Sequence, residues 1–274
     1  MQTLSKECLS IIQKRPQNSH KGTFGRTVLV GGNAQFGGAI IMSTEACVQA
    51  GSGLTTVITD PTNHPALHAR MPEAMSVDWN DRQLCDSVIA SADIILIGPG
   101  LGEDKKSQEL LSYIFKSQTK DQYLIIDGSA ISLFAKGNEE LPYPEMTVFT
   151  PHQMEWQRLS GIKIADQTEK INQAVQQELQ ATIVLKSHQT EIYNARNAFQ
   201  NPLGNPGMAT GGTGDTLAGI IAGFLAQFPH SVETINAAVY LHSYIADQLA
   251  HDNYVVLPTK ISQALPYWMK KFEK

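Results

Sequence analysis

Four glycines and one aspartate lie close together in the stretch from Asn205 to Asp215. Glycine has no Cβ, so its backbone N–H groups can approach a phosphate closely, and the unpaired N–H groups at a helix N-terminus favour anions. A run of apolar residues with helical spacing follows: Leu217, Ile220, Ile221, Phe224, Leu225 and Phe228. This pattern predicts a phosphate cradle at the start of a helix.

Asp215 is the chemically distinctive residue of this stretch. Its negative charge makes it a poor phosphate ligand, but it could take a proton from a hydroxyl group while the loop holds a phosphoryl group. The alternative is that Asp215 only caps the helix, because aspartate is a preferred N-cap residue. Four glycines at one helix start favour the phosphate site over the cap.

Other residues that could do chemistry follow predicted strands. They are Gly31 and Gly32, Gly98 to Gly102, Asp127, His152 and Lys186. Ligands of open α/β sheets bind beyond the carboxyl ends of the strands. We therefore expect these residues to line one crevice.

The sequence allows both a functional and a structural role for several of these side chains. His152 fits ligand contact or helix capping equally well, and Glu155 could hold Mg²⁺ through water or cap the same helix. Lys186 could reach a phosphate or extend to solvent. His242 lies on an apolar helical stripe, which favours a core histidine with satisfied hydrogen bonds.

The spacing of the elements indicates how these residues are positioned. Apolar runs near 27–30, 54–59, 75–79, 93–97, 123–127, 147–150 and 182–186 read as strands, with 190–193 as a hairpin partner of the last. Helical patterns lie between them, near the N-terminus, and at 214–228, 231–251 and 259–272. The expected fold class is α/β, with a central, mostly parallel sheet covered by helices on both faces. We expect a single domain over residues 1–274.

Composition and missing motifs exclude several classes of protein. The net charge of -5 and the absence of a Lys/Arg run argue against nucleic acid as a partner. No apolar run could span a membrane, and three scattered cysteines form neither a disulfide framework nor a zinc site. Gly38-Ala39 stands where a P-loop needs Lys-Ser/Thr. We expect a soluble, cytoplasmic protein.

Four segments, taken together and in order, resemble one known family. They are Val30–Asn33 with Phe36–Ala39, Gly98–Gly102, Thr150–His152 with Glu155, and Gly204–Asp215. The residues Gly211-Gly212-Thr213-Gly214-Asp215 resemble the anion-hole and base motif of the ribokinase-like superfamily. The combination is similar to the stand-alone form of the ADP- or ATP-dependent (S)-NAD(P)H-hydrate dehydratases, over nearly the whole chain.

The resemblance implies a repair reaction on hydrated NADH and NADPH, which carry an extra hydroxyl on the nicotinamide ring. ADP or ATP would be the phosphoryl donor, with Mg²⁺ bridging its phosphates. Asp215 would deprotonate the ring hydroxyl, and the amides of the loop, with Gly212 and Gly214 as catalytic positions, would stabilise the transferring phosphoryl group. The phosphorylated hydroxyl would then leave as phosphate.

The resemblance also implies which residues bind each substrate. Ala39, Gly102, His152 and Asp215 match positions that contact the hydrated dinucleotide. Gly214 and the segment Lys186, Ser187, His188, Gln189 and Thr190 match positions that contact the nucleotide. The family usually has glycine where this chain has Ser187, so the contacts of that segment depend on the turn that Ser187 forms.

Relatives of this kind form tetramers, and many carry an epimerase domain ahead of the dehydratase domain. A chain of 274 residues leaves no room for that domain, so we expect a homo-oligomer that works with a separate NAD(P)H-hydrate epimerase. The main rival is an alcohol kinase of the same superfamily, which would stop at a stable phosphoester. A non-catalytic nucleotide-binding protein is the second rival, but a binding site gains nothing from an aspartate beside phosphate.

Overall fold

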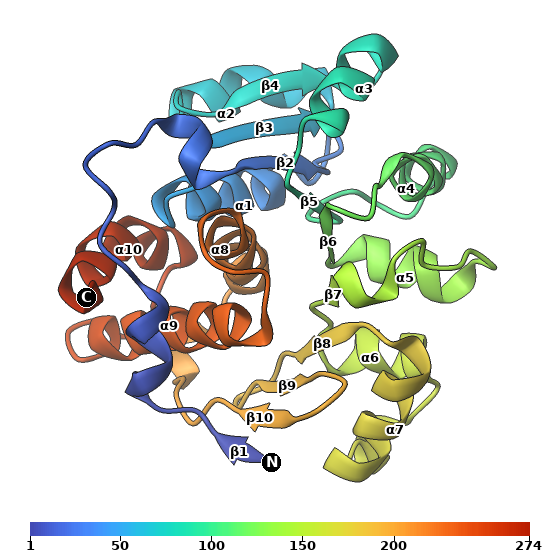
Figure 1. Ribbon diagram of the computed structural model, residues 1–274. Helices are drawn as coiled ribbons and strands as arrows, with labels where there is room; N and C mark the ends of the chain where they lie inside the picture. Colours follow the sequence, from blue (N-terminus) through green and yellow to red (C-terminus); the bar gives the residue numbers. More distant parts are fainter.

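The computed structural model describes all residues 1–274 and is built around one sheet of ten strands (Figure 1). The strands are β1 (Gln2–Thr3), β2 (Arg26–Val30), β3 (Leu54–Thr59), β4 (Met75–Asp78), β5 (Ile94–Ile97), β6 (Tyr123–Ile126), β7 (Thr147–Phe149), β8 (Thr182–Leu185), β9 (Glu191–Tyr193) and β10 (Ala198–Gln200). Their order in the sheet is β1-β10-β9-β8-β7-β6-β5-β2-β3-β4. The predicted strands are all present.

The sheet is mostly parallel, as the fold class predicts. The strands β2 to β8 pair with one another in parallel, and β9 pairs antiparallel with both β8 and β10. The β8–β9 pair confirms the predicted hairpin. Because the parallel strands point the same way, the loops that follow β2, β5, β6, β7 and β8 meet at one edge of the sheet.

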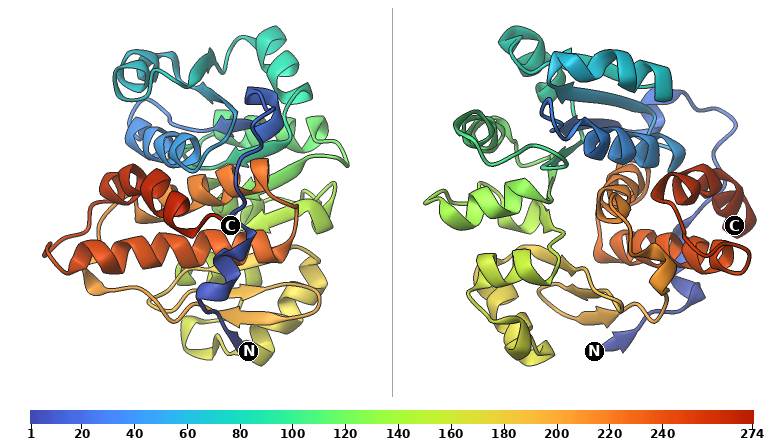
Figure 2. Two further views of the ribbon diagram at one scale, coloured as in Figure 1. Left: turned by 60° about the vertical axis from the view of Figure 1, so that its left-hand side comes forward. Right: turned by 180° about the vertical axis from the view of Figure 1, so that it is seen from behind.

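Helices cover both faces of the sheet (Figures 1 and 2). The helices are α1 (Gly37–Gln49), α2 (His64–Arg70), α3 (Arg82–Ala90), α4 (Lys105–Ser117), α5 (Ser129–Lys136), α6 (Gln153–Ser160), α7 (Glu169–Leu179), α8 (Thr213–Gln227), α9 (Val232–Ala250) and α10 (Pro258–Phe272). One hydrophobic cluster joins the sheet to α1, α8, α9 and α10, and the other joins it to α3–α7. Side chains that alternate along each strand supply the two clusters: Leu29 faces the first, and Val28 and Val30 face the second.

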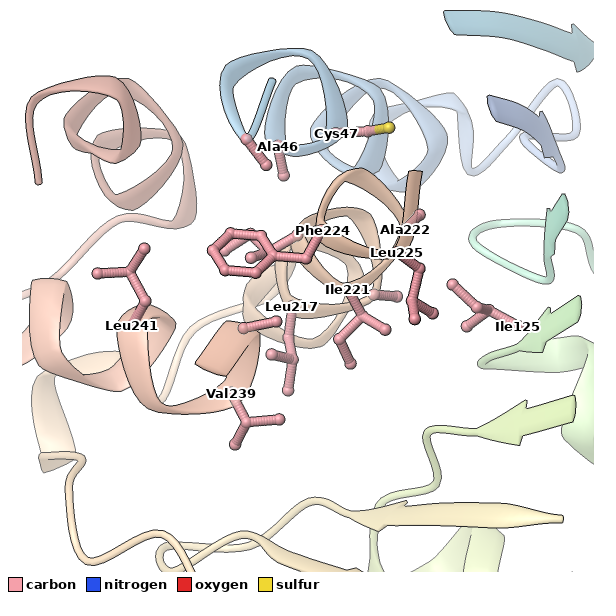
Figure 3. Packing of buried hydrophobic residues seen from close by; sticks show 14 of the residues in the cluster. Ala46, Cys47, Ile125, Leu217, Ile221, Ala222, Phe224, Leu225, Val239 and Leu241 are labelled. Carbon is pink, nitrogen blue, oxygen red and sulfur yellow. The ribbon is translucent and has the colours of Figure 1, made fainter. Parts of the chain in front are cut away.

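α8 is the central helix of the first cluster, because it contacts β2, β5 and β6 of the sheet as well as the helices α1, α9 and α10 (Figure 3). Every residue from Thr216 to Leu225 is buried. The predicted apolar face is present, and small residues bury the other side of the helix as well. A methyl group at Gly219 would overlap the Ser43 carbonyl oxygen, so glycine there allows α1 and α8 to pack closely.

Short elements account for the remaining differences. The predicted N-terminal helix is a 3₁₀ helix, Lys6–Ile11, whereas α2, β1 and β10 were not predicted. β1 and β10 have two and three residues, too few to show a period of alternation. None of the helices has the length and apolar character needed to cross a membrane.

Candidate active site

Two loops at the carboxyl edge of the sheet form one wall of the site. The loop after β2 is joined to the loop after β5 by hydrogen bonds from Gly32 N to Pro99 O (2.9 Å) and from Asn33 N to Gly100 O (2.8 Å). Gly102 has a φ of 90°, and a side chain there would meet the Asn33 amide. These bonds hold Gly102 beside the loop that leads into α1, where Ala39 lies in the first turn.

Asp127 and Lys186 form a buried ion pair at the ends of β6 and β8. The Lys186 Nζ lies 2.7 Å from Asp127 Oδ1, which also accepts a hydrogen bond of 2.6 Å from the Thr150 hydroxyl. The Asp127 side chain is 2% exposed and that of Lys186 is 18% exposed. Lys186 therefore does not extend freely to solvent, the alternative left open by the sequence.

His152 and Glu155 begin α6 with reciprocal hydrogen bonds. The His152 Nδ1 accepts from the Met154 and Glu155 N–H groups (3.1 and 3.2 Å), and Glu155 Oε2 accepts from His152 N (2.8 Å). The capping reading is thus confirmed for both residues. The His152 side chain is about half exposed, and its contact with substrate stays a prediction.

The glycine-rich loop enters α8 with a left-handed turn. Gly212, with a φ of 96°, is the N-cap residue, and Thr213 Oγ1 donates to the carbonyl oxygens of Met208 (2.9 Å) and Thr210 (3.0 Å). Asp215 is the third residue of the helix, and α8 has no side-chain cap. The N-cap reading of Asp215 is therefore wrong, because Gly212 occupies that position and leaves the carboxylate available for other chemistry.

A single hydroxyl group ties the start of α8 to the start of α1. The Ser43 Oγ lies 2.9 Å from the Asp215 carbonyl oxygen and 3.1 Å from that of Ala39. The Ser43 hydroxyl thus contacts the backbone of both Asp215, the candidate base, and Ala39, a candidate substrate-binding residue. The sequence offered no signal for Ser43, because its role depends on the packing of two helices distant in the chain.

Three carboxylates act on the one ammonium group in this crevice. Burial raises the pKa of Asp215 to about 6, with the Asp127 charge adding to the effect and the Lys186 charge opposing it. Burial likewise raises the pKa of Glu155. Burial alone would lower the pKa of Lys186, but the negative charges of Asp127, Glu155 and Asp215 outweigh it and raise that pKa. Asp215 is therefore set to accept protons near neutral pH.

A cavity of about 630 Å³ opens beside the start of α8. Its lining includes the predicted nucleotide-binding residues, Lys186, Ser187, His188, Gln189, Thr190 and Gly214, together with the segment from Pro202 to Pro206. A methyl group on Gly214 would lie 3.0 Å from the Lys186 Nζ, so glycine keeps the lysine and the helix N-terminus close together. The Ser187 hydroxyl donates to Gln189 O (2.8 Å) and accepts from Gln189 N (3.1 Å), so its side chain closes the turn.

His242 also lines this cavity, which corrects the prediction of a satisfied core histidine. The residue is 3% exposed, as a core position would be, but its Nε2 atom is buried without a hydrogen-bond partner. Burial and the Lys186 charge lower the pKa of His242 to about 4. The apolar stripe of its helix hid this feature, because periodicity reports burial and not hydrogen bonding.

The sequence did not predict the ion pair that Asp127 forms with Lys186. The position of Asp127 after an apolar strand placed it at the crevice, but its contact with Lys186 depends on the pairing of β6, β7 and β8. The protein has no group of three or more His, Cys, Asp or Glu side chains arranged to hold a metal ion. Mg²⁺ commonly takes phosphate and water oxygens together with one or two carboxylates, and the contact of Glu155 with such an ion stays a prediction.

These features define a class of protein: an α/β fold with a glycine-rich helix start and a partly buried carboxylate at the carboxyl edge of a mostly parallel sheet. A crystal structure of a ribokinase-like superfamily protein from Enterococcus faecalis matches with a TM-score of 0.98 and 62% identity, over 99% of this chain and 96% of that one. Residues 27–267 match the model of the NAD(P)H-hydrate dehydratase family. The chain belongs to that family.

Two further similarities agree with this assignment. The ADP-dependent (S)-NAD(P)H-hydrate dehydratase of E. faecalis is 62% identical over 99% of this chain and 94% of its own length. The crystal structure of the ADP/ATP-dependent NAD(P)H-hydrate dehydratase of Bacillus subtilis, co-crystallised with ATP and Mg²⁺, has a TM-score of 0.87 and 27% identity. That match covers 99% of each chain.

Proposed function

We propose that this protein dehydrates the S form of hydrated NADH and NADPH, with ADP or ATP as phosphoryl donor. The observation that carries the proposal is Asp215: a partly buried carboxylate, with its pKa raised to about 6, in the first turn of a helix whose Gly214 lines a cavity. A base of this strength can remove a hydroxyl proton near neutral pH. Family membership supports the hydrated nicotinamide ring as the carrier of that hydroxyl.

Each residue has a role in the proposed reaction. Asp215 accepts the proton of the ring hydroxyl, whose oxygen attacks the terminal phosphate of the nucleotide. The N–H groups of Gly212 and Gly214 lie at the helix N-terminus and stabilise negative charge on the transferring phosphoryl group. Cleavage of the ring C–O bond then releases phosphate, and loss of a proton from the adjacent ring carbon restores the dihydronicotinamide.

The substrates divide between two parts of the crevice. Ala39, Gly102 and His152 contact the hydrated dinucleotide, whereas Lys186, the turn from Ser187 to Thr190 and Gly214 hold the nucleotide in the cavity. Mg²⁺ neutralises phosphate charge when bound, which matters in a crevice with three carboxylates and one lysine. Glu155 would be the protein group that contacts such an ion, through water.

Several wider features belong to the same proposal. Residues 1–274 act as a single domain, the chain assembles as a tetramer in the cytoplasm, and a separate epimerase converts the R form of the hydrate to the S form. Size-exclusion chromatography with light scattering measures the assembly directly. A monomer at micromolar concentration would contradict the tetramer without affecting the reaction.

The decisive experiment supplies hydrated NADH, Mg²⁺ and either ADP or ATP, and follows the absorbance of the dihydronicotinamide. Recovery of NADH with release of one phosphate per turnover supports the dehydratase. An alcohol kinase would instead consume nucleotide on a different alcohol and leave a stable phosphoester. Absence of NADH recovery with both nucleotides, in protein that binds them, would remove the dehydratase proposal.

A further inference from the structure

A second cavity, of about 590 Å³, opens at the ends of α1 and α8 that are far from the catalytic loops. It is lined by the chain from Ile11 to Pro16, here called the N-terminal arm, by the last residues of α1 and α8, and by α10. No residue lines both this cavity and the one beside Lys186. Its volume is that of a site for a small organic molecule, and the proposed reaction does not use it.

Specific contacts fix the N-terminal arm, so the second cavity is a feature of the folded chain. Lys14 N donates to Lys274 O, and Lys274 N donates to Ile12 O, both at 3.1 Å. Further along the arm, Arg15 Nη2 donates to the carbonyl oxygen of Gly51, just beyond α1. The wall that these residues form is therefore held at both ends, by the C-terminal residue and by the end of α1.

The charged side chains that line the second cavity are not balanced. Lys270 pairs with Glu273, whereas Lys14 and Arg15 belong to none of the ion pairs in the structure. Burial lowers the pKa of Arg15, because its cation has lost part of its water without gaining a carboxylate. Two unpaired cations at one cavity, in a protein with a net charge of -5, favour an anionic group there.

The rest of the lining favours an apolar body over a polyphosphate. Apolar side chains from the arm, both helix ends and α10 contribute to it, namely Ile12, Phe24, Val48, Phe228 and Met269. The helices that end here present carbonyl groups, the negative pole of the helix dipole, and not the N–H groups that hold phosphates. Gln227 Nε2 already donates to the carbonyl oxygens of Ala50 and Gly223. A ligand with several negative charges is therefore disfavoured, whereas a single one can lie at Lys14 and Arg15.

We propose that the second cavity binds a small amphipathic anion, a molecule with one carboxylate or sulfonate group on an apolar body. The anionic group lies at Lys14 and Arg15, and the apolar body packs against Val48 and Phe228. The inference does not depend on the proposed function, because the second cavity and the nucleotide cavity have no lining residue in common.

The test is a fluorescence titration with two probes that share one aromatic framework. 8-Anilinonaphthalene-1-sulfonate carries an anionic group, and N-phenyl-1-naphthylamine does not. In Lys14→Met/Arg15→Met the dissociation constant of the sulfonate should rise by about tenfold, whereas that of the neutral probe should stay within about twofold. Val48→Trp fills the cavity and should weaken both probes by about tenfold or more. Lys116→Met/Lys120→Met is the matched control, because it removes two exposed positive charges away from the cavity.

Each other outcome overturns the inference. Equal losses in Lys116→Met/Lys120→Met would show attraction to the overall charge only, and binding that survives Val48→Trp would place the probes elsewhere. Wild-type protein that binds neither probe would also overturn it. If Val48→Trp then breaks up an assembly seen by light scattering, the cavity is a contact between copies of the chain.

Thermal unfolding of each variant checks that it is folded. If the loss of the Arg15 guanidinium loosens the arm, Lys14→Met alone gives the same comparison, because Lys14 is held through its backbone. The sulfonate should then bind about threefold more weakly, and the neutral probe should be unaffected. An unchanged affinity for the sulfonate in folded Lys14→Met would exclude its ammonium from the site.

Discussion

Replacement of Asp215 by asparagine should abolish turnover and at the same time stabilise the protein. The Asp215 carboxyl has a pKa of about 6 in the folded protein, against an ordinary value of 3.8. This difference corresponds to about 3 kcal/mol, because one pKa unit corresponds to about 1.4 kcal/mol. The folded protein therefore bears a cost of that order for ionising Asp215 at neutral pH, and the neutral amide removes it.

The pH dependence follows from the direction of the shift. Below about pH 4 the carboxyl is protonated in both the folded and the unfolded chain, so it contributes no difference. As the pH rises from 4 to 6 the unfolded chain ionises first, and the wild-type protein loses stability relative to Asp215→Asn. Between pH 4 and pH 7 the stability of Asp215→Asn relative to wild type should therefore rise by about 2.5 kcal/mol. For a chain of 274 residues this corresponds to about 4 °C in melting temperature.

Thermal unfolding of both proteins without ligands, at several pH values between 4.5 and 7.5, measures this difference. Turnover should fall by about a thousandfold or more, whereas ADP affinity should be kept or improved because a negative charge leaves the phosphate site. Asp121→Asn, at an exposed position, controls for the chemical change itself. A stability difference that does not vary with pH would refute the raised pKa, and turnover within tenfold of wild type would refute the assignment of Asp215 as base.

Two further variants test the supports of the site. Gly219→Ala forces α8 away from α1, so thermal unfolding should show a loss of stability of about 1–3 kcal/mol. Gly38→Ala is the control, because a methyl group at Gly38 would meet open space and should not lower the stability. Asp127→Asn removes a charge that raises the pKa of Asp215, so the acid limb of the kcat profile should move to lower pH; an unmoved limb would mean that the two carboxylates do not interact.

The sequence predicted those parts of the protein in which local pattern and tertiary structure agree. Buried parallel strands are continuous apolar runs, and each was found with its boundaries within a residue or two. The short strand β10 and the helix α2 were missed because their stability comes from neighbours and not from their own pattern. Gly212 belongs to the glycine-rich run that the sequence analysis singled out. Ser43 was missed, because its hydroxyl acts in a contact between two helices that are distant in the chain.

The ionisable residues show most clearly what a sequence leaves undetermined. Asp127, Glu155, Lys186 and Asp215 come from four different segments, and each alone allowed a bland interpretation as a turn, a cap or a surface charge. Their chemistry arises when parallel pairing puts the ends of β6, β7 and β8 side by side and α8 brings Asp215 against them. The crevice then holds three carboxyl groups and a single ammonium group, that of Lys186. Burial and this excess of carboxylates together disfavour the ionised form of Asp215, which is why its pKa is raised to about 6 although Lys186 lies in the same crevice.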